Sequence, residues 1–374
     1  MKKILLVTTI YPPQIGGPAT FINHFARFLA KKGNKVIVVC ISDQKHPEID
    51  NIESFTVYRI TPGFLKVSFH LRKWLILLHT IFTSDKVLLN GLEEDAHKIC
   101  KVLKRKYILK IVGDKAWEFG RNNSLTTLNV DEFQKEEIEN KKLSDIRKMM
   151  QKYVQAASFV YVPSNYLKGM VIGWGKKAAD VVVVNNSVPV KKIDMIDKKT
   201  NELFKILFVG RITNWKGVES LLMAVNGMTQ VEVTICGDGP ALSVYEEMNR
   251  RLGNTNVNFT GRIKPSIVSN LLIQTDILVL ASLYEGLSHT LLEAISLGKP
   301  CIASNIGGNP EVITHGYNGL LFDPYNYIEL KEHILKLVDD NDYYNKLANG
   351  ALESTLKFDI EDNFNKVENL LIQL

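Results

Sequence analysis

Short β-rich runs alternate with helical segments along most of the chain, and this alternation constrains the fold more than any other feature of the sequence. Lys3–Thr8 is an apolar run, Ala19–Lys31 has helical periodicity that ends before Gly33, and Lys35–Ile41 is a second apolar run. Further strands are expected at Phe55–Ile60, Lys86–Leu89, Tyr107–Val112, Ser158–Val162 and Val181–Val184. Continuous apolar strands separated by helices are typical of a doubly wound parallel sheet.

A polar, lysine-rich stretch divides the chain into two such units. Val188–Glu202 reads VPVKKIDMIDKKTNE, which suits an exposed connection. The alternation then resumes, and the last stretch, Tyr327–Leu374, predicts two or three helices with a break near Phe358 and Asp359. Because 374 residues exceed what one hydrophobic core usually serves, we expect two α/β domains. The strands expected in the second unit are Leu203–Val209, Val231–Cys236, Val257–Thr260, Ile277–Leu280 and Pro300–Ser304.

The two halves of the chain carry opposite net charge. Residues 1–200 hold 33 Lys and Arg against 19 Asp and Glu, a balance of +14, whereas residues 201–374 have a balance of −8. A basic half can bind nucleic acid, anionic lipid headgroups or a phosphorylated substrate, and charge alone does not choose between them. Four cysteines in apolar stretches, without metal-ligand spacing, favour reduced thiols and a cytoplasmic location: Cys40, Cys100, Cys236 and Cys301.

The apolar window Phe64–Phe82 bears on a membrane location. Basic residues such as Lys66 and Arg72 interrupt it, so we expect no membrane-spanning helix, and the N-terminus has no small-residue cleavage site that would indicate a signal peptide. The window nevertheless mixes basic and large apolar residues, and Lys101–Lys106 adds a basic cluster. Two interpretations stay open: peripheral binding at the inner face of a membrane, or a buried helix with lysines that reach out to solvent.

The loops that follow predicted strands are the places to look for chemistry, because open α/β sheets bind ligands beyond the carboxyl ends of their strands. The loop after Lys3–Thr8 contains Gly16 and Gly17, which allow backbone to approach a ligand closely. The helix that follows offers N–H groups to an anion, although a plain strand-to-helix turn explains the glycines equally well. Neither G-x-G-x-x-G nor a P-loop lysine pattern occurs, so dehydrogenases and nucleoside triphosphatases lack their fingerprint here.

Two cations follow the first strand of the second unit. Arg211 and Lys216 stand five residues apart where both can point at a diphosphate, the Arg as a planar fork and the Lys as a point charge. An ordinary solvated pair is the alternative. A glycine-rich loop that includes Gly237 repeats this layout at the next strand end, and by itself it could be only a turn.

The strongest signal is a pair of glutamates eight residues apart. Glu285 follows an apolar strand, and Glu293 lies on the helix expected after it. Carboxylates can hold the hydroxyls of a ligand while amides at a helix N-terminus hold its phosphate, and a nucleotide sugar carries both groups. A chance glutamate near a helix start explains Glu285 but not a polar Glu293 on an apolar face. The N–H groups expected at the helix end are those of Gly286, Leu287 and Ser288.

These motifs together resemble the donor-binding domain of retaining glycosyltransferase family four, which has the GT-B fold. The matching runs are Ser-x-x-Glu-Gly-Leu-x-x-x-Leu-Leu-Glu-Ala from Ser282, Gly298-Lys299-Pro300, Gly307-Gly308-x-Pro310-Glu311, Asn318-Gly319-Leu320, Gly210-Arg211 with Lys216-Gly217, Gly237-Asp238-Gly239-Pro240, Gly261-Arg262 and Gly16-Gly17. The resemblance implies two Rossmann-like doubly wound domains that face each other across a cleft. Residues 1–188, with a C-terminal helix from about 358 to 374, would bind the acceptor, and residues 203–357 would bind the donor.

The resemblance also implies roles for individual residues. Glu293 would bind the ribose, Arg211 and Lys216 the diphosphate, and Glu285 with the Gly286–Ser288 backbone the donor sugar and its phosphate. The Gly16-Gly17 loop would approach the diphosphate from the other domain. Gly237 would belong to the donor-binding loops, and Arg262 would lie near the base. The implied reaction transfers a hexose-type sugar, with retention and without metal or cofactor, from a UDP-, GDP- or ADP-linked donor to a glycan, glycolipid or cell-envelope acceptor.

One departure from the family pattern affects the acceptor side. Many members have a His after the strand that corresponds to Tyr107–Val112, whereas this chain has Gly113 and Asp114. The Asp114 carboxylate could accept the proton of the acceptor hydroxyl, or it could be a turn residue. The run Asp340-Asn341-Asp342 has the spacing of metal-dependent transferases but lies between predicted helices, so we expect it to cap a helix.

Two alternative functions would use the same nucleotide-sugar site. A nucleotide-sugar epimerase of similar fold would convert the donor without an acceptor, and a binding module would hold a nucleotide sugar or polyanion without chemistry. A nucleic-acid partner is not expected, because it would leave the acidic second half unexplained.

Overall fold

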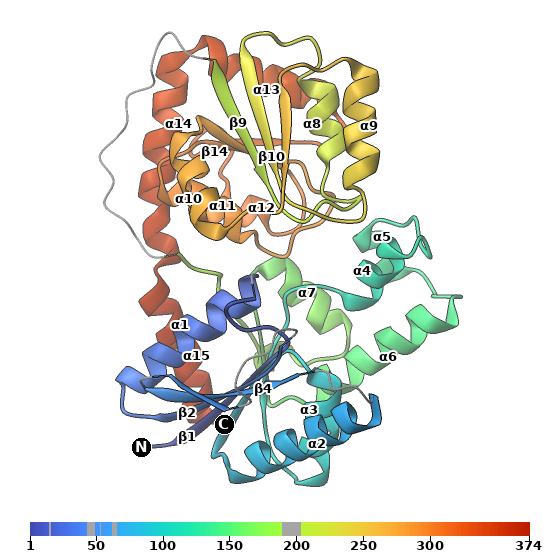
Figure 1. The fold of residues 1–374 in the computed structure, drawn as a ribbon, viewed down its shortest axis with the longest axis vertical. Coiled ribbons are helices and arrows are strands. Elements are labelled where there is room, and N and C mark those ends of the chain that lie inside the picture. The colour runs from blue at the N-terminus through green and yellow to red at the C-terminus, as the bar shows by residue number, and fades with distance from the viewer. Residues whose placement is uncertain (15, 43–48, 53, 62–65, 189–202) are drawn as a thin grey trace.

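The computed structural model contains two α/β units, each built around a sheet (Figure 1). It describes residues 1–14, 16–42, 49–52, 54–61, 66–188 and 203–374. The connection predicted at Val188–Glu202 lies outside these described residues except for Val188. Both sheets are dominated by parallel strands with helices on their faces, which is the predicted pair of Rossmann-like domains.

The described residues of the first unit form a sheet in the order β3-β4-β2-β1-β5-β6-β7-β8. Every neighbouring pair is parallel except β3 and β4. The strands are β1 (Lys3–Thr8), β2 (Lys35–Ile41), β3 (Ile49–Ile52), β4 (Phe55–Ile60), β5 (Lys86–Asn90), β6 (Ile108–Lys110), β7 (Phe159–Val162) and β8 (Val181–Val183). The helices are α1 (Gly17–Lys31), α2 (Lys66–Thr83), α3 (Glu93–Val102), α4 (Lys115–Asn122), α5 (Val130–Lys135), α6 (Lys141–Ala156) and α7 (Asn165–Gly173).

The second unit has a fully parallel sheet among its described strands, in the order β11-β10-β9-β12-β13-β14. The chain runs outward from β9 and then returns to the other side of β9 with β12, so the direction of winding reverses between these two strands. The strands are β9 (Phe204–Val209), β10 (Val231–Cys236), β11 (Val257–Gly261), β12 (Ile277–Leu280), β13 (Cys301–Ser304) and β14 (Gly319–Phe322). The helices are α8 (Val218–Ala224), α9 (Leu242–Leu252), α10 (Pro265–Gln274), α11 (His289–Ser296), α12 (Asn309–Val312), α13 (Tyr327–Asp339) and α14 (Asn341–Ser354).

The C-terminal helix α15 (Ile360–Gln373) crosses from the second unit back to the first, where Figure 1 shows it beside α1. Asp359 caps its N-terminus by accepting the N–H groups of Glu361 and Asp362, and this cap marks the predicted break. The Phe364 ring lies 5.3 Å from the Phe25 ring, centre to centre, within the core under α1. The helix thus completes the hydrophobic core of the first unit.

Most predicted strands are confirmed, but the sequence misses β3 and β14, and β6 is shorter than the predicted Tyr107–Val112. Val112 lies beyond the end of β6, and its carbonyl oxygen faces Gly286 of the second unit. Helix α1 begins at Gly17, two residues before the predicted start. No helix in the described ranges combines the length and the hydropathy needed to cross a bilayer.

Candidate active site

The loops after β9, β10 and β11 lie side by side at one edge of the second sheet. The Gly210 N–H donates to the Cys236 carbonyl at 3.0 Å, and the Gly237 N–H donates to the Gly261 carbonyl at 3.0 Å. Gly237 has φ +148°, and a Cβ there would lie 1.8 Å from the Gly210 oxygen, so only glycine fits. The structure therefore places Gly237 inside the loop packing, while Arg211 and Arg262 expose their side chains along the same edge.

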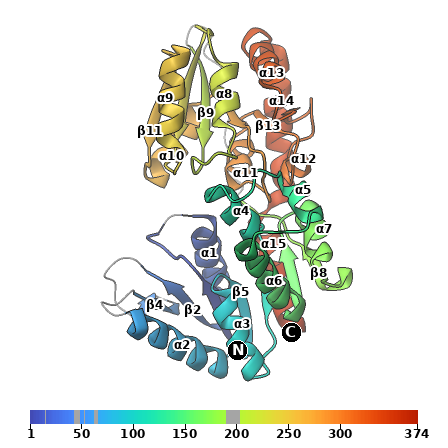
Figure 2. The ribbon, with the colours of Figure 1, turned by 90° about the vertical axis from the view of Figure 1, so that its right-hand side faces the viewer.

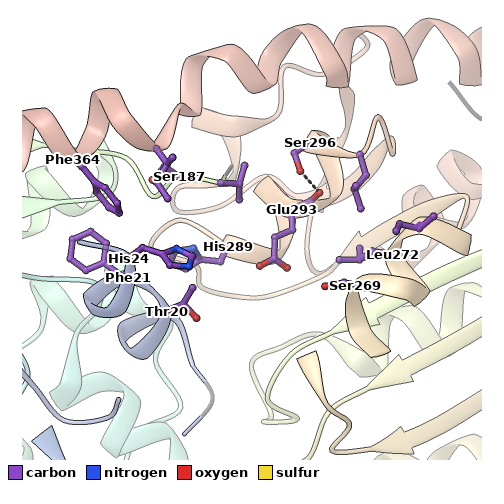
Figure 3. A pocket seen from close by; sticks show the side chains of 14 residues that line it. Thr20, Phe21, His24, Ser187, Ser269, Leu272, His289, Glu293, Ser296 and Phe364 are labelled. Carbon is purple, nitrogen blue, oxygen red and sulfur yellow. Dashed lines mark hydrogen bonds between the residues drawn. The ribbon is translucent and has the colours of Figure 1, made fainter. Parts of the chain in front are cut away.

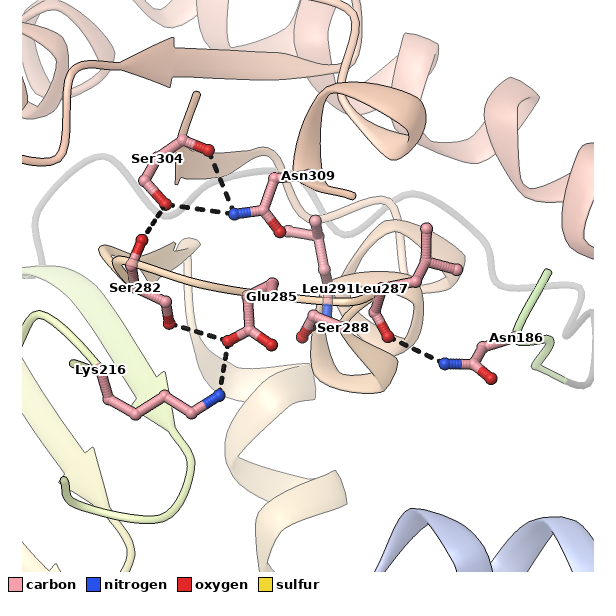
Figure 4. A network of polar contacts seen from close by, with 9 residues as sticks. All are labelled: Asn186, Lys216, Ser282, Glu285, Leu287, Ser288, Leu291, Ser304 and Asn309. Carbon is pink, nitrogen blue, oxygen red and sulfur yellow. Dashed lines mark hydrogen bonds and ion pairs between the residues drawn. The ribbon is translucent and has the colours of Figure 1, made fainter. Parts of the chain in front are cut away.

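Lys216 and Glu285 meet at the point where the winding reverses (Figure 4). The Lys216 Nζ lies 2.6 Å from Glu285 Oε1, and the same oxygen accepts a hydrogen bond from Ser282 Oγ at 2.8 Å. Gly217 has φ +71°, and a Cβ there would lie 1.9 Å from the Ala281 carbonyl oxygen. Glycine thus lets the loop after β9 lie against the end of β12, which brings the lysine to the carboxylate.

A second layer of hydrogen bonds fixes the Glu285 loop. The Ser304 Oγ donates to the Ser282 carbonyl at 2.5 Å, and Asn309 Nδ2 donates to the Ser304 carbonyl at 3.1 Å, as Figure 4 shows. The Gly308 N–H donates to the Glu285 carbonyl at 2.9 Å. Because buried side chains and backbone hold it from two sides, the carboxylate is preorganised for a ligand.

The residues after Glu285 lead into α11. Gly286 and Leu287 are buried, and Ser288 caps the helix by accepting the Leu291 N–H at 3.3 Å. Glu293 is exposed and points into a cavity of about 200 Å³ between the two units (Figure 3). This cavity is lined from the first unit by α1 and α15 and from the second unit by α10 and α11. The structure thus separates the two glutamates, with Glu285 in the Lys216 network and Glu293 at the cavity.

The N-termini of α1 and α11 face each other across the units. A Cβ on Gly17, the first residue of α1, would lie 3.0 Å from the His289 ring, and His289 is the first residue of α11. Burial and the nearby Lys110 cation lower the pKa of His289 to about 4, so its imidazole is neutral at pH 7. Two helix ends with partial positive charge therefore converge beside the Gly16-Gly17 loop, as an anion site requires.

The structure places Asp114, the candidate predicted for the acceptor side, at the N-terminus of α4. Asp114 is 1% exposed and caps α4, where Oδ1 accepts the N–H groups of Ala116 at 2.8 Å and Trp117 at 3.0 Å. Its Oδ2 accepts the Gln134 amide at 2.7 Å. Both oxygens accept hydrogen bonds, which agrees with the turn interpretation of Asp114.

A different acidic residue of α4, Glu118, turns toward the site. It lies one turn after Asp114, and its carboxyl forms no hydrogen bond or ion pair with any described residue. Burial raises the pKa of Glu118 to about 7, and the Lys216 cation opposes this shift. Nothing in the sequence marks this residue, because acidic side chains are common in the first turn of helices.

Contacts between the units surround these groups, and Figure 2 shows α4 reaching toward the second unit. The Glu311 carboxylate accepts the Asn165 N–H at 2.8 Å and the Tyr166 N–H at 2.9 Å, so the second unit caps α7 of the first. The sequence shows Glu311 only as part of a family motif, and its partner in the other unit could not be read from it.

No cluster of three or more His, Cys, Asp and Glu side chains in the described part of the chain could hold a metal ion. Asp340, from the run with metal-like spacing, caps α14 by accepting the Tyr343 N–H at 2.8 Å, as predicted. The four cysteines are buried free thiols.

Comparison with known proteins shows what this chain is similar to. Residues 190–354 match the model of the glycosyl transferases group 1. An uncharacterized glycosyltransferase of Methanocaldococcus jannaschii is 24% identical over 97% of this chain and 95% of its own length. The alpha-D-kanosaminyltransferase of Streptomyces kanamyceticus is 28% identical over 39% of each chain.

Solved structures share the fold of the whole chain. Sucrose-phosphate synthase from Thermosynechococcus elongatus superposes with a TM-score of 0.82 at 17% identity and covers 100% of this chain and 99% of its own. Anabaena HepE, solved in complex with UDP and glucose, gives 0.80 at 19% identity with complete coverage of both chains. The chain therefore has the GT-B fold, and the second half of its sequence is similar to glycosyl transferases group 1.

Proposed function

We propose that this chain is a retaining glycosyltransferase that moves a hexose-type sugar from a nucleoside-diphosphate sugar to a hydroxyl of a glycan, lipid-linked or cell-envelope acceptor. The observation that carries the proposal is the Lys216–Glu285 pair, fixed at the point of winding reversal beside two converging helix N-termini. Such a site suits a ligand with both hydroxyls and a diphosphate. The complexes of Anabaena HepE with UDP and with UDP-glucose support this choice of donor class.

In the proposed reaction, the chain binds and neutralises the leaving group. Glu293 holds the ribose at the cavity, Arg262 and Gly237 border the base, and Arg211 with Lys216 holds the diphosphate. The bond from the sugar C1 to the β-phosphate oxygen breaks while the acceptor oxygen bonds to C1 on the same face. The acceptor proton passes to the departing phosphate. Lys216, Arg211 and the helix ends stabilise the charge that develops there, so the chemistry needs no metal ion.

In this proposal the two units bind different substrates. Residues 203–357 bind the donor, which is UDP-, GDP- or ADP-linked, and residues 1–188 with α15 bind the acceptor. The Gly16-Gly17 loop and α1 approach the diphosphate from the acceptor side. The cavity between α1, α10 and α11 is in keeping with a donor held between the units.

The stereochemistry of the first product tests the proposal. The enzyme is incubated with UDP-glucose, GDP-mannose or ADP-glucose, and the anomeric proton of the released or transferred sugar is followed by NMR. We expect a first product with the donor's anomeric configuration. An inverted first product would contradict retention, and conversion of the donor to its epimer alone would identify an epimerase instead.

An exposed apolar face on α2 indicates where a lipid-linked acceptor would be met. One side of α2 is buried through Leu77 and Ile81, whereas the opposite side exposes large apolar residues. The Arg105 guanidinium donates to the Phe82 carbonyl at 2.7 Å, so the basic cluster adjoins this face. The exposed side chains are Leu71, Trp74, Leu75, Leu78 and Phe82, and the exposed cations are Lys101, Lys104, Arg105 and Lys106. Apolar residues flanked by cations fit an anionic lipid surface at the inner face of a membrane.

Vesicle flotation tests this surface. We expect the protein to float with phosphatidylglycerol vesicles and not with pure phosphatidylcholine, and Leu75→Glu to reduce the bound fraction about tenfold because it places a charge on the apolar face. Leu356→Glu is the control, since Leu356 is 72% exposed on the second unit. Equal loss in both variants, or self-association of the free protein through this face in light scattering, would overturn the membrane assignment.

A further inference from the structure

The Glu118 carboxyl is a titratable group at the candidate site that the proposed reaction does not use. It has no hydrogen bond or ion pair within the described ranges, although its neighbours include Lys216 and Glu285. We propose that Glu118 binds a hydroxyl of the transferred sugar from the first unit, opposite Glu285, and so helps to select that sugar. This inference rests on the proposed function, because it presupposes a nucleotide sugar at Lys216 and Glu285.

Helix α4 is fixed against the donor-side loops, which gives Glu118 a defined position. The Trp117 ring lies 5.5 Å from the Trp215 ring and 5.1 Å from the Tyr284 ring, centre to centre, and both contacts cross between the units. The Asn214 amide lies 3.5 Å from the Arg121 carbonyl and adds a second link. Because Trp215 directly precedes Lys216, these contacts hold Glu118 close to the predicted diphosphate and sugar positions.

The absence of a side chain at Gly113 leaves room for the carboxyl. A Cβ at Gly113 would lie 2.5 Å from Glu118 Oε1 and 3.3 Å from Tyr284 Oη. The Tyr284 hydroxyl is buried; the Asp114 backbone N–H acts on its oxygen, and its own proton has no acceptor among the described residues. The Glu118 carboxyl and the Tyr284 hydroxyl thus lie at one spot, and buried polar groups such as this hydroxyl are almost always satisfied in native proteins. A sugar hydroxyl, which both donates and accepts, can satisfy the two together.

The surrounding charges set the pKa of Glu118 so that both its protonated and its ionised form are populated near pH 7. Burial, Asp114 and Glu285 raise the pKa of Glu118, whereas Lys216 and Lys115 lower it, and the balance is about 7. A bound diphosphate adds negative charge beside Lys216 and weakens its effect on Glu118. The carboxyl then becomes more protonated and can donate to a sugar oxygen as well as accept from a hydroxyl.

Paired titrations with and without the sugar test the inference. Wild type, Glu118→Ala, Glu118→Gln and Gly113→Ala are titrated with UDP and UDP-glucose, and with GDP and GDP-mannose, by calorimetry. We expect the three variants to bind the nucleoside diphosphate within about twofold of wild type. For the sugar-linked form, Glu118→Ala should lose at least about tenfold in Kd and Glu118→Gln less, as for one hydrogen bond to a charged group. Gly113→Ala should match Glu118→Ala, because its Cβ displaces the carboxyl.

The outcomes separate this inference from the function on which it rests. Deoxy analogues of the sugar identify the hydroxyl, since the Glu118→Ala penalty should vanish for the analogue that lacks it. Equal effects on the diphosphate and the sugar-linked form, or no effect on either, would overturn the role of Glu118. Failure of wild type to bind any nucleotide would instead overturn the proposed function. Glu136→Ala, an exposed carboxylate just past α5, is the matched control and should change neither Kd.

Discussion

Replacing Lys216 with alanine is expected to lower kcat/KM for the nucleotide sugar by at least about 100-fold, the usual effect of removing one group that stabilises transition-state charge. The substitution lowers activity in two ways. The variant loses the cation that faces the diphosphate, and it leaves the Glu285 carboxylate, which is 9% exposed, without its counter-charge. Steady-state release of the nucleoside diphosphate, with water or an acceptor taking the sugar, measures the loss.

The control for this variant is Lys346→Ala, which removes an exposed lysine from α14, away from the site. It should keep wild-type kinetics, and circular dichroism should show both variants folded. Activity of Lys216→Ala within about threefold of wild type would remove Lys216 from the donor site.

Gly286→Ala is expected to remove most activity by forcing the two units apart. A Cβ at Gly286 would lie 2.4 Å from the Val112 carbonyl oxygen and 2.8 Å from Leu167 Cδ1, both in the first unit. The backbone at Gly286 does not need glycine for its own conformation, since its φ is not positive. The clash therefore acts between the units rather than within one, and each unit should still fold. Small-angle scattering should show a larger radius of gyration, and donor turnover should fall at least about tenfold, as small misplacements of catalytic groups do.

Gly169→Ala tests whether a methyl group as such does harm, because nothing lies within 4 Å of its Cβ position on α7. We expect unchanged scattering and activity for this control. A Gly286→Ala variant that keeps wild-type turnover and dimensions would show that the contact between Gly286 and Val112 does not set the geometry of the site.

The strands that are easiest to predict from this sequence are those that form a continuous apolar run. Lys35–Ile41 is apolar along its whole length, and its predicted and observed limits agree. β3 (Ile49–Ile52) is an antiparallel edge strand with two polar residues in its centre, so it has no such run. β14 begins at Gly319, and glycine is a weak strand former, so the pattern does not indicate a strand. The structure requires glycine at this position because a Cβ there would lie 2.5 Å from the Cys301 carbonyl oxygen.

The candidate site was likewise only partly predictable from the sequence. Lys216 and Glu285 lie 69 residues apart, and the rule that ligands bind beyond the carboxyl ends of parallel strands pointed to both of their loops. That both side chains would bind one donor was implied only by the family resemblance. Asp114 and Glu118 lie on one helix, and only side-chain direction separates the capping carboxylate from the one at the cleft. Spacing along the chain carries no information on that direction.

Titration calorimetry of the wild-type protein with UDP, GDP and ADP, repeated with Glu293→Ala, is the most direct test that this site binds a nucleotide sugar. We predict that one of the three binds with a stoichiometry of one and that Glu293→Ala weakens it by about tenfold or more, as expected for lost hydrogen bonds to a carboxylate. Absence of binding by all three to the folded wild-type protein would contradict the donor site.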